Sequence, residues 1–464
     1  MRIKKLGALI LAGTLMCTTP VMPVMASDAT ETVQEIITDN EIDSLVSDPD
    51  KVVDIIMYAK DQVAQQDISD EQIKEIIQTA ESSLLHTYNR FPIVLDHGED
   101  VYLYDTDQKK YLDFAAGIAV FALGYSNDAY KTAVKEQVDK LVHTSNLFYN
   151  EPAAKAAKKI TQLTGMNRVF FTNSGTEAIE GAIKLVRKYA YNKDGRTDHE
   201  IIAMKHSFHG RSMGALSVTG TEHYRTPFEP LIPGVKFAKY NDLDSVKALV
   251  SDKTCAIILE ALQGEGGITP ATDEFMKGLR QICDEEGILL ICDEIQCGMG
   301  RTGSMFAWQG YGVKPDIMTM AKAIGNGVPV GAFAMTKEVA EYSLEPGDHG
   351  TTYGGNPLAC AAVAKTLELF EKYDLTAHVR EIGAYLTEKL DELVAANDAV
   401  LERRGIGLIQ GIKVKKPVGE ISSEALKEGL LIISAKGNVL RLVPPLVIEK
   451  EHVDEMLEIL KKVL

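Results

Sequence analysis

The residues of this sequence that could carry chemistry come directly after short apolar segments. The first set is Ser174, Gly175 and Thr176, which follows the apolar residues 169–171 and opens a stretch with helical spacing. Backbone N–H groups are free at the start of a helix, so together with two hydroxyls they can hold a phosphate. Taken alone, the same residues also fit an ordinary helix cap.

The loop 205–211 combines several recognition groups. It holds the aromatic ring of Phe208, two imidazoles and the guanidinium of Arg211. Two histidines separated by two residues can suggest a metal site, but no third ligand stands at a suitable spacing. We therefore predict no metal here.

Two charged residues follow buried apolar segments. Asp293 comes after 288–292, with Gln296 close behind, and a buried carboxylate needs a cationic partner. Lys322 comes after 317–320, where partial desolvation would lower the pKa of its amine and make it a nucleophile. The alternative is a lysine whose ammonium group reaches solvent.

Together these groups match the needs of pyridoxal 5′-phosphate (PLP). Its phosphate requires an anion site, its ring an aromatic neighbour and an acid beside the pyridine nitrogen, and its aldehyde an amine. The sequence therefore predicts a PLP enzyme.

A glycine-rich segment offers a competing interpretation. Gly298, Gly300 and Gly303 have the spacing of a dinucleotide-binding loop, which would indicate an NAD-dependent enzyme. However, residues 293–296 separate the strand from the first glycine, and no helical pattern begins at Gly303. We expect a tight loop and keep the NAD-dependent enzyme as an alternative.

The elements that must position these groups alternate between strand and helix. From about residue 86, short apolar segments alternate with longer amphipathic ones, which is typical of an α/β sheet covered on both faces. The predicted buried strands are 169–171, 201–204, 256–259, 288–292 and 317–320. Ligands of such sheets bind at the carboxyl ends of the strands, so the chemical groups should meet at one edge.

Composition restricts the partners of the chain. There are 49 basic and 66 acidic residues, a formal charge of −17. An acidic chain without a basic patch repels nucleic acids and anionic membrane surfaces, so we expect neither as a partner.

The first 85 residues differ from the rest. Residues 1–26 have a basic start, an apolar run too short to span a membrane, and small residues before Ser27, which predicts a cleaved secretory signal peptide or an uncleaved leader. Residues 27–85 hold fifteen acidic residues against three lysines and predict an acidic helical extension. Helix starts are expected at Asp48 and at Ser69, where Gln72 completes a capping box. We expect the extension to pack on the main body or on a partner.

Six segments resemble class III PLP-dependent aminotransferases. They are NSGTEA, SFHGR, EALQGEGG, ICDEIQCGMGRTG, DIMTMAKAIGNGVPVGAF and HGTTYGGNPLAC. The resemblance covers residues 86–464 and implies PLP-dependent transferase fold type I: a mostly parallel seven-stranded sheet in a large domain, a smaller α+β domain and a homodimer. The expected parts are 86–145, an N-terminal contribution to the small domain; 146–350, the large domain; and 351–464, a linker helix and the C-terminal small domain.

The resemblance also implies roles for the residues that hold the cofactor. Lys322 matches the lysine that bonds to the cofactor aldehyde and moves the substrate proton. Asp293 matches the acid at the ring nitrogen, and Gln296 matches the group at the ring hydroxyl. The remaining expected cofactor ligands surround the phosphate and the ring face: Ser174, Gly175, Thr176, Phe208 and, from the neighbouring subunit, Thr352.

Substrate roles follow in the same way. Arg211 resembles the carboxylate clamp and Thr351 lies near the substrate. Arg441 resembles a second arginine, which Glu265 masks while the amino donor is bound. Without that mask, 2-oxoglutarate can use both arginines.

Three further segments, HTSNLFYNEP, FEPLIPG and DHGTTYGGNP, resemble the acetylornithine branch. That branch transfers the terminal amino group of N2-acetylornithine to 2-oxoglutarate, in arginine biosynthesis, and gives N-acetylglutamate 5-semialdehyde and glutamate. Enzymes for ornithine, 4-aminobutyrate and putrescine share the skeleton and remain alternatives.

Two features depart from the branch. Phe121 and Tyr125 stand where it has Asn and His, and we expect Phe121 to reshape the substrate pocket. The family implies a cytoplasmic enzyme, whereas residues 1–26 resemble an export signal. An exported, non-enzymatic protein on the same scaffold is therefore a further alternative.

Overall fold

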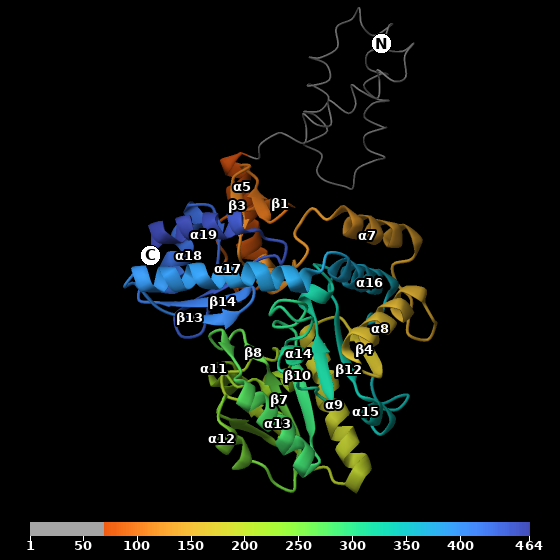
Figure 1. Cartoon of the computed structure of the whole chain (residues 1–464). Helices are drawn as coiled ribbons and strands as arrows, with labels where there is room; N and C mark the ends of the chain where they lie inside the picture. The colour runs from red at the N-terminus through yellow and green to blue at the C-terminus, as the bar shows by residue number, and fades with distance from the viewer. Residues whose placement is uncertain (1–68) are drawn as a thin grey trace, which may run out of the picture. The chain divides into compact units, whose positions relative to one another are not determined.

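The computed structural model describes residues 69–464 (Figure 1). The described chain separates into two units, one of residues 69–94 with 106–108, the other of 95–105 with 109–464. The leader 1–26 and the helix expected from Asp48 lie outside the described residues and stay predictions.

Helix α5 (Asp70–Ser83) of the first unit begins where the sequence predicts. The Ser69 hydroxyl accepts from the Gln72 N–H at 3.3 Å, and the Gln72 side chain accepts from the Ser69 N–H at 2.8 Å. This reciprocal capping box satisfies two amides that have no partner within the helix. No residue of α5 is buried.

The core of the second unit is a seven-stranded sheet with the order β4-β12-β11-β10-β7-β5-β6. Neighbouring strands are parallel except β12, which runs antiparallel to both β4 and β11. The strands are β4 (Arg168–Thr172), β5 (Glu200–Met204), β6 (Val235–Ala238), β7 (Thr254–Glu260), β10 (Leu289–Asp293), β11 (Ile317–Met320) and β12 (Gly331–Met335). The mostly parallel seven-stranded sheet is confirmed.

All five predicted strands are present, and two further strands were missed. Strand β6 reads VKFA and β12 reads GAFAM. A lysine interrupts the first and small residues dominate the second, so neither shows the run of large apolar residues that identifies a buried strand.

Both faces of the sheet are covered. In β7, Ile257 and Leu259 belong to one apolar core, whereas Ala256 and Ile258 belong to the other. Successive side chains of a strand point to opposite faces, so the strand must be apolar at every position. On the second face, helix α9 (Gly175–Asp194) packs its apolar side against β11 and β12.

Two four-stranded sheets lie outside the central one. The first has the order β1-β2-β3-β15 and the second β13-β14-β17-β16. Their strands are β1 (Leu95–Glu99), β2 (Tyr102–Asp105), β3 (Lys110–Asp113), β13 (Val400–Ile406), β14 (Ile409–Val414), β15 (Leu430–Leu431), β16 (Ile433–Ala435) and β17 (Val439–Leu442). Strand β15 pairs in parallel with β3, so early and late segments of this unit share one sheet. The expected division into a large and a smaller domain stays a prediction.

The glycine-rich loop after β10 is a series of turns. No helix begins before α14 (Ala307–Gly310), and Gly300 and Gly303 have φ angles of 76° and 89°. The loop carries Arg301, whose guanidinium is buried and donates to the carbonyls of Leu408 at 2.9 Å and Pro444 at 2.8 Å. The glycines thus permit a tight loop, as expected, and the context of a dinucleotide site is absent.

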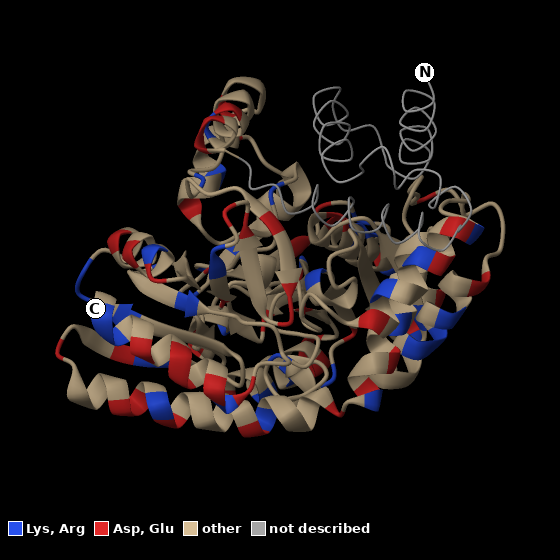
Figure 2. Cartoon of the chain, turned by 90° about the horizontal axis from the view of Figure 1, so that it is seen from above, with Lys and Arg blue, Asp and Glu red and all other residues tan. Residues whose placement is uncertain are grey.

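Acidic and basic side chains are interleaved over the face shown in Figure 2. Several form ion pairs, such as Lys389 with Glu392 and Arg403 with Asp391. Within residues 69–464, no helix combines the length and the apolar composition needed to cross a membrane.

The surroundings of two helical glycines predict opposite effects of substitution by alanine on the free energy of unfolding. A Cβ atom at Gly181 would stand 2.1 Å from the buried ring of Phe333, so Gly181→Ala should lower the free energy of unfolding by about 1–3 kcal/mol. Gly419, in helix α18 (Val418–Lys427), has nothing within 4 Å of that position, so Gly419→Ala should raise it by about 0.5–1 kcal/mol. Urea unfolding measures both changes, and equal effects would contradict the packing described.

Candidate active site

A cavity of about 450 Å³ lies at the carboxyl ends of the parallel strands. It receives residues that follow β4, β5, β7, β10 and β11. The structure brings together the following sequence-predicted residues in its wall: Ser174, Gly175, Thr176, Phe208, Arg211, Asp293, Gln296 and Lys322.

The start of α9 forms the anion-binding side of the cavity. The Ser174 hydroxyl caps the helix by accepting from the Glu177 N–H at 3.3 Å, which leaves the amides of Gly175 and Thr176 without an intrahelical acceptor. A Cβ atom at Gly175 would stand 2.9 Å from Ile295. Glycine therefore lets the start of α9 pack closely against Ile295, with its free amides in the cavity wall.

Asp293 is buried and paired. Its Oδ2 lies 2.7 Å from Nδ1 of His209, and its Oδ1 accepts from the Ile295 N–H at 3.0 Å and from the Thr319 hydroxyl at 3.1 Å. Burial of the imidazole lowers the pKa of His209, but the hydrogen bond and charge of Asp293 outweigh it and raise that pKa. His209 is thus the buried partner of Asp293, and this pairing was not predicted from the sequence.

Lys322 begins the short 3-10 helix η2 (Lys322–Ile324) after β11. Its φ is 51°, a left-handed conformation that costs a side-chain-bearing residue about 1 kcal/mol. Burial and the charge of Arg441 lower the pKa of Lys322 to about 8, against the opposing charges of Glu265, Asp293 and Glu260. A substantial fraction of this amine is therefore neutral and nucleophilic near neutral pH.

Glu260 is a site residue that sequence reasoning missed. It ends β7, is buried, and accepts from the N–H groups of Phe208 at 3.1 Å and Gly264 at 3.3 Å. Burial and the charge of Asp293 raise its pKa to about 7, while His209 lowers it. The signal was present: Glu260 follows an apolar strand, as Asp293 does.

Arg441 reaches the cavity wall from β17. It is buried, forms an ion pair with Glu265, and donates to the Gln296 side chain at 3.1 Å. Its Nε has no partner among the described residues. The structure therefore pairs Glu265 with Arg441, and the masking role of Glu265 stays a proposal.

The remaining predicted residues lie at the margins. The Arg211 guanidinium stacks on the ring of Tyr224 at 3.7 Å, and it remains exposed. The Thr351 hydroxyl accepts from the Asn173 side chain at 3.3 Å, whereas Thr352 is exposed and does not line the cavity of its own chain.

Phe121 lies outside the cavity, next to a residue that lines it. A Cβ atom at Gly327, which lines the cavity, would stand 2.9 Å from the Phe121 ring. The ring also contacts Tyr125 with a centroid distance of 4.7 Å, and the Tyr125 hydroxyl bonds to Asp113. Phe121 thus contacts the glycine loop after Lys322 and does not itself line the cavity.

The residues present fit PLP. A glycine-lined helix start suits the phosphate, the buried Asp293 suits the pyridine nitrogen, and the amine of Lys322 suits the aldehyde. Within residues 69–464, no group of three His, Cys, Asp or Glu side chains is placed to hold a metal.

Comparisons with known proteins agree with this site. The family model described as aminotransferase class-III matches residues 84–464. An acetylornithine aminotransferase of Methanocaldococcus jannaschii is 46% identical over 82% of this chain and 95% of its own, and one of Clostridium acetobutylicum is 47% identical over 82% and 99%.

Among solved structures, an ornithine aminotransferase of Toxoplasma gondii has a TM-score of 0.81 and 28% identity, covering 88% of this chain and 96% of that one. Its active site holds PLP at partial occupancy. Because the family model spans most of the chain, the cavity described above lies in a member of the class-III aminotransferases, which are PLP-dependent enzymes that transfer amino groups.

Proposed function

We propose that this enzyme transfers the terminal amino group of N2-acetylornithine to 2-oxoglutarate, giving N-acetylglutamate 5-semialdehyde and glutamate. The observation that carries the proposal is the buried Arg441 paired with Glu265 beside a cavity that also presents Arg211. Acetylornithine has one free carboxylate and needs one arginine, whereas 2-oxoglutarate has two and needs both. The acetylornithine aminotransferases that share about half of its sequence support this choice.

When bound, PLP supplies an electron-withdrawing ring that stabilises the negative charge left when a proton leaves the donor carbon. Asp293, which His209, the Ile295 N–H and the Thr319 hydroxyl hold in place, would hold a proton on the pyridine nitrogen. With the cofactor in place, the Lys322 Nζ would take the proton from the donor carbon and return it to the carbon on the other side of the amine nitrogen. Phe208, fixed through its N–H by Glu260, would cover one face of the cofactor ring.

We propose a homodimer in which Thr352 binds the cofactor phosphate of the neighbouring subunit. Thr352 is exposed, and large apolar side chains nearby are exposed as well: Leu147, Phe148, Tyr149 and Tyr353. The Asn146 side chain, next to Leu147, donates to the Gly354 carbonyl at 2.9 Å, which joins the segment 146–149 to the segment 351–354. Such a concentration of exposed apolar side chains is typical of a protein interface.

Ornithine is the second candidate donor, because ornithine aminotransferases are among the structural neighbours. Ornithine also carries an α-amino group, so it could present either amine to Lys322 if Arg441 bound its carboxylate. Putrescine fits less well, since it has no carboxylate for Arg211.

The donor is tested with purified enzyme, PLP and 2-oxoglutarate. We expect kcat/KM for N2-acetylornithine to exceed those for ornithine, 4-aminobutyrate and putrescine by at least about tenfold, measured as glutamate formed. Lys322→Ala should abolish turnover and the visible absorbance of lysine-bound PLP. A higher kcat/KM for another donor would replace the proposed substrate, and turnover by Lys322→Ala would remove the catalytic assignment.

Asp293→Asn tests the acid at the ring nitrogen. The amide keeps the shape and the bonds to Ile295 and Thr319 but loses the negative charge, so kcat should fall on the order of 10³-fold with the fold intact. Rapid mixing with deuterated donor should show that proton removal becomes rate-limiting. Near-normal turnover in a PLP-loaded variant would refute this role.

The pKa of Lys322 predicts the pH dependence of cofactor uptake. Only the neutral amine attacks an aldehyde, and this pKa is lowered to about 8, so the rate of covalent bonding to added PLP should rise with pH up to about 8 and then level off. Borohydride trapping followed by mass spectrometry of the Lys322 peptide measures the rate. A rate that keeps rising toward the ordinary lysine pKa of about 10.4, as for free Nα-acetyl-lysine, would contradict the assignment.

A further inference from the structure

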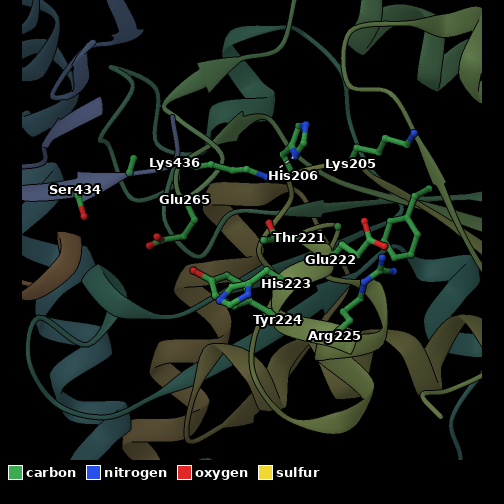
Figure 3. A pocket seen from close by; sticks show the side chains of 13 residues that line it. Lys205, His206, Thr221, Glu222, His223, Tyr224, Arg225, Glu265, Ser434 and Lys436 are labelled. Carbon is green, nitrogen blue, oxygen red and sulfur yellow. Dashed lines mark hydrogen bonds between the residues drawn. The ribbon is translucent and has the colours of Figure 1, made fainter. Parts of the chain in front are cut away.

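A second cavity, of about 750 Å³, has Glu265 in its wall (Figure 3). Its wall carries three cations, Lys205, Arg225 and Lys436, and two carboxylates, Glu222 and Glu265. None of the three cations has a carboxylate within ion-pair distance among residues 69–464, whereas Glu265 is already paired with Arg441. This wall therefore has a surplus of positive charge in a chain whose formal charge is −17.

Lys436 is the cation held closest to Glu265. Its N–H donates to the Glu265 carbonyl at 3.1 Å, so the two residues are neighbours across the wall. Its Nζ lies 2.8 Å from Nδ1 of His206. Figure 3 shows the Lys436 side chain passing beside Glu265 toward His206, whereas Lys205 points away from both.

His206 can hold the lysine without neutralising it. Burial and the charges of Lys436 and Lys205 lower the pKa of His206, so the neutral imidazole accepts a hydrogen bond from the Lys436 ammonium. The Lys436 Nζ keeps further N–H donors for another partner. The backbone N–H of the same lysine bonds to the Glu265 carbonyl, so Lys436 is fixed at both ends beside the residue that is paired with Arg441.

When a second substrate carboxylate binds Arg441, the carboxylate of Glu265 must leave this arginine. A half-buried carboxylate that loses its ion pair has an unfavourable free energy unless another cation or water receives it. Glu265 already lines the second cavity, so this cavity offers open space for its side chain when it leaves Arg441.

We propose that Lys436, held in place by His206, receives the Glu265 carboxylate when the Glu265–Arg441 pair opens. Lys436 is then a positioning residue for the acceptor half of the reaction. This inference rests on the proposed two-arginine binding of 2-oxoglutarate. It predicts that Lys436 affects the binding of ligands with two carboxylates. The ranking of amino donors by kcat/KM should not change, because donors bind while Glu265 stays paired with Arg441.

The test compares Lys436→Met with Lys205→Met, which removes the same charge from the same cavity at a side chain directed away from Glu265. Each PLP-loaded protein is titrated with glutarate, an unreactive dicarboxylate, by absorbance. Each half-reaction is then followed separately in single turnovers. For Lys436→Met we expect the Kd of glutarate to rise about fivefold, and the rate ratio of the 2-oxoglutarate half to the donor half to fall by a similar factor.

Lys205→Met should leave both quantities within twofold of the wild-type values, and Lys436→Arg should restore them. Equal effects of the two methionine variants, or an unchanged ratio in Lys436→Met, would overturn the role of Lys436. Those results leave the proposed function intact, because it fails separately if the wild-type enzyme does not exchange amino groups between acetylornithine and 2-oxoglutarate.

Discussion

A buried carboxyl group at the end of an apolar strand is the constraint on which this active site depends. Asp293 leaves β10 with its neighbours in the strand buried, so its charge must be compensated locally. The protein provides an imidazole at 2.7 Å, a backbone N–H and a hydroxyl. These three partners come from different segments, after β5, after β10 and within β11, and the strand order brings them together.

The same principle explains the other charged groups of the cavity. Glu260 ends the strand beside β10 and uses two backbone amides, while Arg441 enters from another sheet and pairs with Glu265. Lys322 has no fixed partner, and its pKa falls accordingly. Lys322 is therefore the nucleophile of the cavity, because its buried amine has a lowered pKa while the neighbouring charged groups are paired.

Much of this could be predicted from the sequence. Apolar segments located five of the seven central strands, and the polar residues after them located most of the cavity wall. The partners of those residues could not be predicted, because His209 and Asp293, or Thr319 and Asp293, lie far apart in sequence and meet only through the strand order. Likewise the left-handed φ of Lys322 has no signature in a residue type that normally avoids it. The role of Thr352 stays a proposal, since it depends on a second copy of the chain.

The pairing of β3 with β15 has a consequence for biosynthesis. Leu112 aligns with Leu430, so the sheet that begins near the start of the second unit gains its last strand only after the central sheet has been synthesised. Until residues 430–431 have been synthesised, β3 is paired with β2 on one side only. Its other edge then exposes unpaired backbone N–H and C=O groups, which can pair with another nascent chain.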